Sequence, residues 1–157
     1  MRISNCRSPR ADPTLGAAAI AGLVPHQGSM CLLDRALSWD AAEILCATGR
    51  HRDPANPLRR DGMLPAVCGL EFAFQAMALH GALSAGGAQR PGFVSSLREV
   101  ALEVERLDDI PDELRIAATA LMAEAGGFIY RFAITAGDRR LLHGQAAVIL
   151  PREDTPA

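Results

Sequence analysis

The most prominent hydrophobic segment of the chain runs from Pro65 to Leu83, where nearly every residue is apolar. Only Glu71, Gln75 and His80 add hydrogen-bonding or charged side chains to it. Proline is favoured at the first position of a helix, and the glycines around the end of the segment are typical of a helix terminus. A helix that is apolar on every side is buried on every side. We therefore expect a helix over Pro65–Leu83 with other elements wrapped around it.

The second half of the chain alternates between apolar and polar residues, which is the period of a strand with one buried face. Short turns rich in glycine and aspartate separate these stretches, as expected for antiparallel neighbours. Two earlier stretches predict a hairpin that precedes the helix. The predicted strands are Cys31–Trp39, Glu43–Arg50, a segment that includes Val100–Val104, Leu114–Ala120, Phe128–Ile134 and Arg139–Leu150. This pattern predicts an α+β fold in which one antiparallel sheet curls around one helix.

The domain boundaries follow from length and from the composition of the two ends. The chain has 157 residues, which fits one domain. We assign this domain to residues 13–150 and expect it to begin with a short helix capped by Asp12 or Thr14. Residues 1–12 and 151–157 are polar and irregular, so we expect a flexible N-terminus and a flexible C-terminus.

Composition excludes several classes of function. The formal net charge is -2 and the arginines are scattered, so the sequence lacks the basic patch of a nucleic-acid-binding protein. The four cysteines form no C-x-x-C pair, which argues against a metal site or a redox motif and favours reduced thiols. The apolar run Gly16–Val24 is too short to span a membrane. We expect a cytoplasmic protein that binds neither nucleic acid nor membrane.

Glu71 is the strongest candidate for a catalytic residue, because an ionised carboxylate on a buried helix costs several kcal/mol unless it is compensated. Gln75 lies four residues later, on the same helical face, where its amide can donate to the carboxylate. Burial should raise the pKa of Glu71 toward the useful range of a general acid, although the nearby helix start opposes this shift. A structural alternative is an ion pair of Glu71 with Arg59, Arg60 or Arg98.

The start of the predicted helix offers a second feature. The backbone N–H groups of Ala66 and Val67, directly after Pro65, are expected to lack intrahelical acceptors. Together with the positive end of the helix dipole, they could polarise the carbonyl group of a bound substrate.

Two of the four histidines lie in predicted loops from which they could reach Glu71, namely His26 and His51. His80 lies nine residues after Glu71, on the opposite side of the helix, so we expect it to be structural. His143, within the last predicted strand, is expected to be structural as well. His26 is our first choice for a base that works with Glu71.

Two motifs carry a resemblance to a known family. The chain has P-H-x-x-x-M-x-L-L-D-R at Pro25–Arg35 and G-x-L-P-A-x-x-G-L-E-x-x-x-Q-A-M-A at Gly62–Ala78. With these motifs, residues 23–150 resemble the bacterial 3-hydroxyacyl-[acyl carrier protein] dehydratases, and most closely their diverged aryl polyene branch. The resemblance implies a hotdog fold, in which dimers place two long helices side by side within one continuous sheet.

The resemblance also implies an activity and a site. Family members remove water from a 3-hydroxyacyl group that the phosphopantetheine arm of acyl carrier protein carries, without a cofactor of their own and without metal. A helix carboxylate of one subunit works with a loop histidine of the other. The carboxylate matches Glu71, and the amide one turn later matches Gln75. Pro65 matches the family's helix proline, and in this mechanism we expect the helix-start amides of Ala66 and Val67 to hold the thioester carbonyl.

The chain departs from the family at the histidine. Counted back from Pro65 and Glu71, the family's catalytic histidine falls at Pro57, and Ala66 replaces a family glycine. Three explanations stay open: His26 or His51 serves instead, the chain is a non-catalytic partner of an active paralogue, or its pocket binds acyl chains without dehydrating them. A hotdog thioesterase is a further alternative. The expected partners are acyl carrier protein and, in a homodimer or heterodimer, a second dehydratase subunit.

Overall fold

The computed structural model describes residues 14–152, so the expectations for the flexible ends, for Asp12 as a cap and for Cys6 fall wholly or largely outside the described residues. Within that range, seven strands form a single antiparallel sheet in the order β1-β2-β3-β5-β6-β7-β4. The strands are β1 Leu15–Gly16, β2 Arg35–Trp39, β3 Glu43–Thr48, β4 Phe93–Leu102, β5 Leu114–Glu124, β6 Gly127–Ala136 and β7 Arg139–Ile149. The predicted α+β class and the antiparallel C-terminal strands are confirmed.

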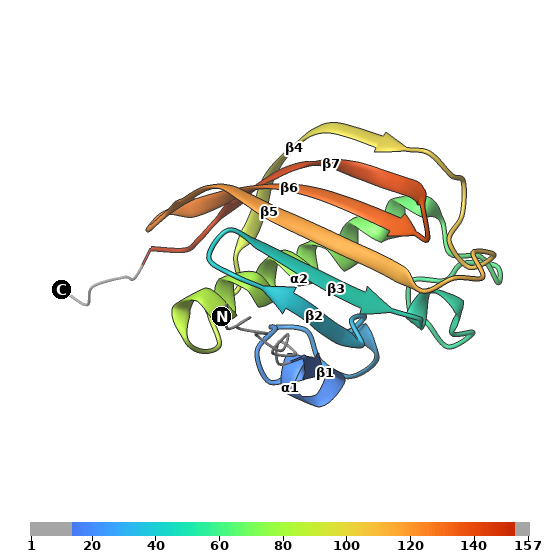
Figure 1. Cartoon of the computed structure of the whole chain (residues 1–157), viewed down its shortest axis with the longest axis horizontal. Coiled ribbons are helices and arrows are strands. Elements are labelled where there is room, and N and C mark those ends of the chain that lie inside the picture. The colour runs from blue at the N-terminus through green and yellow to red at the C-terminus, as the bar shows by residue number, and fades with distance from the viewer. Residues whose placement is uncertain (1–13, 153–157) are drawn as a thin grey trace, which may run out of the picture.

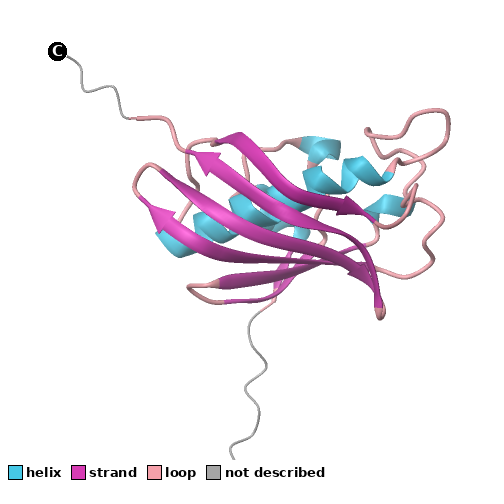
Figure 2. Cartoon of the chain, turned by 90° about the horizontal axis from the view of Figure 1, so that it is seen from above, coloured by secondary structure: helices cyan, strands magenta, loops and turns pink. Residues whose placement is uncertain are grey.

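The sheet curls around one long helix, α2, which spans Gly69–Ala85 (Figure 1). Figure 2 shows the same arrangement from above, with the helix lying along one face of the strands. The core lies between them: Phe72, Ala76 and Leu79 of α2 are completely buried, as is Ile116 of the facing β5. The sheet therefore supplies the cover that the apolar helix requires.

The predicted helix start was wrong by four residues. Pro65 has extended backbone, and Ala66–Cys68 form a separate 3-10 turn before α2 begins at Gly69. The reason is that Pro65 pairs with Arg106 as an isolated β-bridge, which holds the chain extended up to that point. At the other end α2 reaches Ala85, where Gly86 has the left-handed φ of 80° that favours glycine. Glu71 consequently lies in the first turn of α2.

Gly69 lets α2 approach the sheet closely. A Cβ at this position would collide with the side chain of Leu142 on β7 and touch Leu107 and Ile134. We expect Gly69→Ala to lower the free energy of unfolding by about 1–3 kcal/mol through overpacking, measured by denaturant titration. Gly81→Ala is the matched control, because nothing lies within 4 Å of its added Cβ, and it should raise stability by about 0.5–1 kcal/mol. Equal effects of the two substitutions would contradict this packing account.

The N-terminal elements agree with the predictions in part. The hairpin of β2 and β3 is confirmed, although Cys31–Asp34 precede the first strand rather than belong to it. The short helix α1 spans Ala17–Ala21, but its cap is Gly16, without a side-chain hydrogen bond, and not Thr14. Leu15 and Gly16 pair with β2, so the chain stays extended until the helix begins.

The segment Ala66–Ala85 is long and apolar enough to span a membrane by length and composition. More than half of its most apolar window, 56%, is buried inside the domain, as expected for a core helix. The cysteines of the described part are free, as predicted: Cys31 and Cys46 are buried and Cys68 is half-buried.

Candidate functional site

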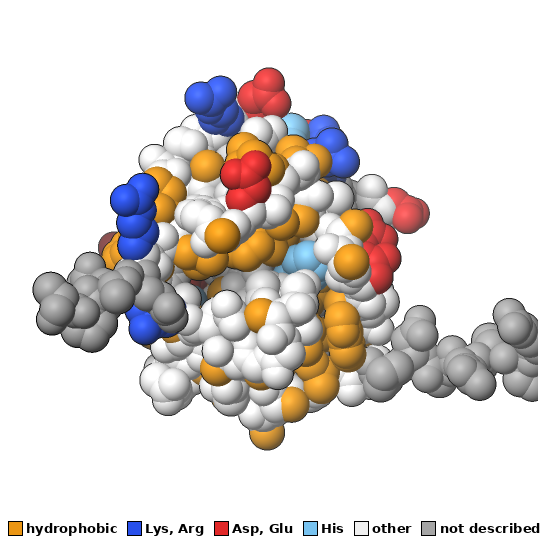
Figure 3. Space-filling model, turned by 90° about the vertical axis from the view of Figure 1, so that its left-hand side faces the viewer, with side chains coloured by type: hydrophobic (Ala, Val, Ile, Leu, Met, Phe, Trp, Pro, Cys, Tyr) orange, Lys and Arg blue, Asp and Glu red, His pale blue; other side chains and the backbone are white. Residues whose placement is uncertain are grey.

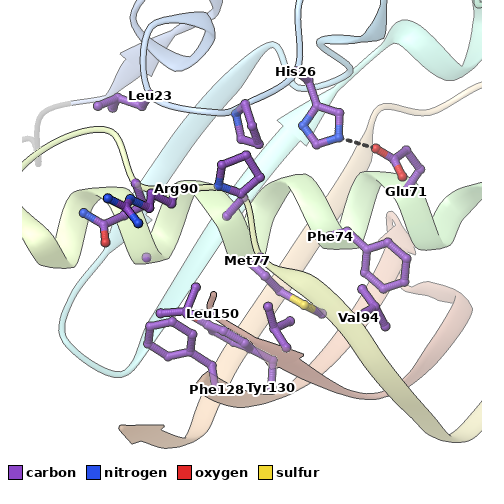
Figure 4. A pocket seen from close by; sticks show the side chains of 17 residues that line it. Leu23, His26, Glu71, Phe74, Met77, Arg90, Val94, Phe128, Tyr130 and Leu150 are labelled. Atoms are coloured by element: carbon purple, nitrogen blue, oxygen red, sulfur yellow. Dashed lines mark ion pairs between the residues drawn. The ribbon is translucent and has the colours of Figure 1, made fainter. Parts of the chain in front are cut away.

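The structure brings His26 and Glu71 of the same chain together. Nε2 of His26 lies 2.6 Å from Oε1 of Glu71, and the two side chains are 26% and 27% exposed (Figure 4). His26 lies in the loop between α1 and the 3-10 turn Gly28–Met30, whereas Glu71 belongs to α2. Of the two loop histidines considered from sequence, His26 is therefore the one that reaches the carboxylate.

Gln75 fixes this contact from the next turn of the helix. Its amide nitrogen donates to Oε1 of Glu71 at 3.3 Å and to the carbonyl oxygen of Met30 at 2.6 Å. Its amide oxygen accepts the backbone N–H of Leu32 at 2.8 Å. Gln75 is completely buried, and its two bonds to Met30 and Leu32 anchor the segment that follows His26 directly to α2. The predicted pairing of Gln75 with Glu71 is confirmed.

Two further contacts shape the loop around His26. The thiol of Cys31 donates to the carbonyl oxygen of His26 at 3.1 Å, and the N–H of Met30 donates to the carbonyl of Gln27. The second ring nitrogen of His26, Nδ1, is buried and has no hydrogen-bond partner within residues 14–152. The loop thus directs one imidazole nitrogen at the carboxylate, and the other has no partner in the part of the chain that the structure describes.

The predicted direction of the Glu71 pKa was wrong. Burial is the largest single influence and raises the pKa, as expected. The hydrogen bonds from His26 and Gln75 and the charge of His26 together outweigh it, so the net pKa of Glu71 is lowered from its ordinary value. The alternative of a salt bridge with Arg59, Arg60 or Arg98 is also replaced, because the ion pair that Glu71 forms is with His26. At neutral pH the carboxylate is ionised.

His51 does not reach the site. Its side chain is completely buried, and Nε2 lies 3.0 Å from the carbonyl oxygen of Ile110. A carbonyl accepts only, so Nε2 carries the proton, and burial lowers the pKa of the ring. His51 therefore holds two loops together, and the expectation that it serves as a base beside Glu71 is not met within the chain.

The backbone N–H groups at the helix start also differ from the prediction, because one of them already has an acceptor. The N–H of Ala66 donates to the carbonyl oxygen of Glu105 at 3.0 Å, which removes it as a donor for a substrate carbonyl. Pro65 and Ala66 instead connect the segment before α2 to the segment after β4. The side chain of Val67 is 53% exposed, and the role of its amide stays a prediction.

An apolar cavity of about 240 Å³ lies beside the His26–Glu71 pair (Figure 4). Its walls come from the loop before His26, one face of α2, the segment that links α2 to β4, and strands β4, β6 and β7. Figure 3 shows a band of hydrophobic side chains across the end of the molecule that faces left in Figure 1. The residues that line the cavity besides the pair are Leu23, Pro25, Phe74, Met77, Ala78, Gly81, Gln89, Arg90, Pro91, Gly92, Val94, Phe128, Tyr130, Val148 and Leu150.

Sequence reasoning missed most of this lining, because the residues come from segments that only the fold brings together. The pattern of α2 was the available signal, since Phe74, Ala78 and Gly81 lie on the helical face of Glu71. The lining includes no residue from 51–62, the segment where the family's histidine was expected.

His80 has the structural role that was predicted, on the side of α2 away from Glu71. Its Nε2 lies 2.8 Å from the carbonyl oxygen of Asp40, and its Nδ1 lies 2.8 Å from the hydroxyl of Tyr130. Because a carbonyl only accepts, Nε2 carries the proton and Nδ1 accepts the Tyr130 hydroxyl. Burial raises the pKa of Tyr130 to about 12, so this hydroxyl stays protonated. The contact fixes the Tyr130 ring in the wall of the cavity.

Comparison with known proteins adds an identification to this geometry. The family model described as ApeP dehydratase matches residues 18–157, which is most of the chain. The chain belongs to the ApeP-like dehydratase family. The resemblance to dehydratases that the two motifs carried is thereby confirmed. No protein of curated function matches the chain significantly by sequence.

Solved structures place this ApeP-like chain among hotdog proteins. The dehydratase heterocomplex ApeI:P from Xenorhabdus doucetiae matches with a TM-score of 0.75 and 20% identity, over 85% of this chain and 91% of that one. The HP0420 homologue from Helicobacter felis matches with a TM-score of 0.59 and 14% identity, over 87% and 90%. A hypothetical thioesterase with coenzyme A from Streptococcus pneumoniae matches with a TM-score of 0.54 and 14% identity, over 74% and 84%. At these identities the likeness establishes the fold and leaves the chemistry to the site.

Proposed function

We propose that this ApeP-like chain is a dehydratase subunit that removes water from 3-hydroxyacyl thioesters in aryl polyene type biosynthesis. The observation that carries the proposal is the His26–Glu71 contact of 2.6 Å beside an apolar cavity, in a member of a dehydratase family. His26 takes the place of the histidine that is absent at Pro57. Both reacting groups then come from one chain rather than from two subunits.

The reaction requires one proton to leave C2 and one to join the departing hydroxyl. His26 accepts the C2 proton, the electrons of the C2–H bond form the double bond, and the C3–O bond breaks. In this step His26 starts neutral and accepts the C2 proton at Nδ1, and its Nε2 proton passes through the Glu71 carboxylate to the departing hydroxyl, which yields water. One proton enters the pair and one leaves it, so its proton count is unchanged after each turnover. Positioned acid and base groups of this kind contribute typically 10²–10⁴-fold to a rate.

The substrate is proposed to arrive on the phosphopantetheine arm of acyl carrier protein in the cytoplasm. The apolar side chains of the cavity suit an acyl group, and they exclude water from the proton transfers. The reaction combines two proton transfers with cleavage of the C3–O bond and causes no net oxidation or reduction, so we propose that it uses no metal or redox cofactor besides the carrier.

The test of this activity is the product. The chain, alone and with its paralogue, should convert a 3-hydroxyacyl thioester into the conjugated enoyl thioester, followed by its ultraviolet absorbance. Release of free thiol, followed with a thiol reagent in the same samples, would instead identify a thioesterase. Absence of both products, together with stable binding to an active paralogue, would identify a non-catalytic partner.

We also propose that β4 joins this chain to a second dehydratase subunit. The strand lies at one end of the sheet, so its outer edge is unpaired within residues 14–152. Its apolar side chains are unusually exposed, with Phe93 at 66%, Leu97 at 41% and Leu102 at 46%. An unpaired edge with exposed apolar side chains is a template for pairing with another chain. The heterocomplex of ApeI with ApeP supports a paralogue as the partner.

Leu97→Glu is expected to weaken this association at least tenfold, because it places a charge on the proposed contact. Light scattering of the purified complex, or of the chain alone, measures the loss. Leu121→Glu is the matched control, since Leu121 is as exposed but lies on β5, away from the free edge. If Leu121→Glu weakened the association more than Leu97→Glu did, the interface would lie on β5 and not along β4.

A further inference from the structure

One face of α2 forms a continuous wall of the cavity. Glu71, Phe74, Ala78 and Gly81 all line it, and their spacing places them within a quarter turn of the helix. Beyond Phe74 the side chains on this face become smaller, from phenylalanine to alanine and then to glycine. The cavity therefore runs along the helix, with the proposed reaction at one end and Gly81 farther along.

The distance along this wall corresponds to a chain of defined length. A helix rises 1.5 Å per residue, so Gly81 lies about 15 Å along the axis from Glu71. A fully extended chain advances about 1.2 Å per bond, as the 3.3–3.6 Å spanned by the three bonds of one residue indicates. About a dozen bonds of an acyl chain therefore fit between the reacting carboxylate and Gly81.

Gly81 has no packing reason to be glycine. Gly69, on the same helix, is required because a Cβ there would collide with Leu142, whereas a Cβ at Gly81 meets nothing within 4 Å. Glycine inside a helix costs roughly 0.5–1 kcal/mol relative to alanine. The position nevertheless lacks a side chain on the face of α2 that lines the cavity, whose lining also includes Phe128 and Leu150. What Gly81 provides is open space within the cavity.

We propose that Gly81 determines the length of acyl chain that the cavity admits. This inference rests on the proposed function, because it assumes that the thioester lies at Glu71 and the acyl chain extends along α2. A side chain at position 81 would then shorten the cavity without disturbing the His26–Glu71 pair. Gly81 is thus a specificity-determining residue and takes no part in proton transfer.

The experiment compares crotonyl and trans-2-dodecenoyl thioesters in the hydration direction. Gly81→Leu should lower kcat/KM for the dodecenoyl thioester at least tenfold and leave the crotonyl thioester within about twofold of wild type. Gly81→Ala should give a smaller loss in the same direction, together with a higher melting temperature. Ala85→Leu is the control, because Ala85 is exposed on the same helix and outside the cavity lining, and it should not change the length preference.

Equal losses for both thioesters would overturn the proposal, since they would mean that the carrier arm rather than the acyl chain passes Gly81. Unchanged values for both would overturn it as well. Calorimetric binding of butyryl- and dodecanoyl-pantetheine to the same variants separates this question from catalysis. If wild type shows no turnover, the proposed function fails, whereas a selective loss of dodecanoyl binding in Gly81→Leu would still support the length limit.

Discussion

Glu71→Gln is expected to reduce dehydration of 3-hydroxyacyl thioesters at least about 100-fold, the low end of what a positioned acid or base contributes. Glutamine keeps the size of the side chain and its place between His26 and Gln75, but it cannot pass a proton to the leaving hydroxyl. The loss should appear in kcat more than in KM, because the acyl chain still fits the cavity. Initial rates of enoyl thioester formation, with wild type at the same concentration, measure it.

The stability of this variant provides its control. The pKa of Glu71 is lowered in the folded state, so the ionised carboxylate stabilises the fold above the unfolded pKa of glutamate. That contribution disappears as the pH falls through the folded pKa. Glu71→Gln should therefore melt slightly below wild type at neutral pH and nearly together with it in acid. A variant that retains full activity would contradict the assignment of Glu71, whatever its melting temperature.

His26→Ala is expected to cause a loss of similar size and, in addition, to raise the pKa of Glu71. Burial, the largest influence on this carboxyl, raises its pKa, and the hydrogen bond and charge of His26 are what reverse that effect. Without the imidazole, only Gln75 opposes burial. NMR titration of the Glu71 side-chain carboxyl should show the upward shift, and any acid limb of residual activity should move to higher pH.

His143→Ala is the matched control for this prediction. His143 lies on β7, with Nε2 3.8 Å from Glu103, and is absent from the cavity lining. Its removal should leave both the rate and the Glu71 pKa unchanged. The double variant of His26 and Glu71 should be little worse than either single variant, because residues that act as a unit are not additive. Additive losses would mean that the two side chains work separately.

The fold could be predicted from the sequence because its two periodicities are unambiguous. The apolar stretch before Leu83 and the alternating strands after Leu114 are long patterns, and their order allows one sheet around one helix. The element boundaries were less accessible, because contacts distant in sequence set them. The bridge between Pro65 and Arg106 delays α2, and the pairing of Leu15 and Gly16 with β2 delays α1.

A contact within the site could be predicted only where both of its residues lie on the same helix or strand. Gln75 follows Glu71 by one helical turn, and this contact was found from spacing alone. The choice between His26 and His51 depended on which of their two loops lies beside Glu71 in the folded chain. No local sequence pattern encodes that position. The direction of the Glu71 pKa was missed for the same reason, because it depends on an imidazole that arrives from 45 residues away.

The site carries a consequence for the assembly. In the family pattern, the carboxylate and the histidine come from different subunits, whereas here His26 and Glu71 belong to one chain. Under the proposed function, a dimer partner covers β4, and the chemistry of this chain does not depend on a histidine from the partner. The contribution of each subunit can therefore be separated by experiment.

The most direct test uses the complex of this chain with its paralogous dehydratase, in which the paralogue's own catalytic carboxylate has been replaced by its amide. Dehydration of 3-hydroxyacyl-[acyl carrier protein] by this complex is followed as enoyl thioester formation. We predict that activity remains and that adding Glu71→Gln to this chain abolishes it. The account would be contradicted if the disabled paralogue left no activity, while an intact paralogue paired with the Glu71→Gln chain turned over at the full rate.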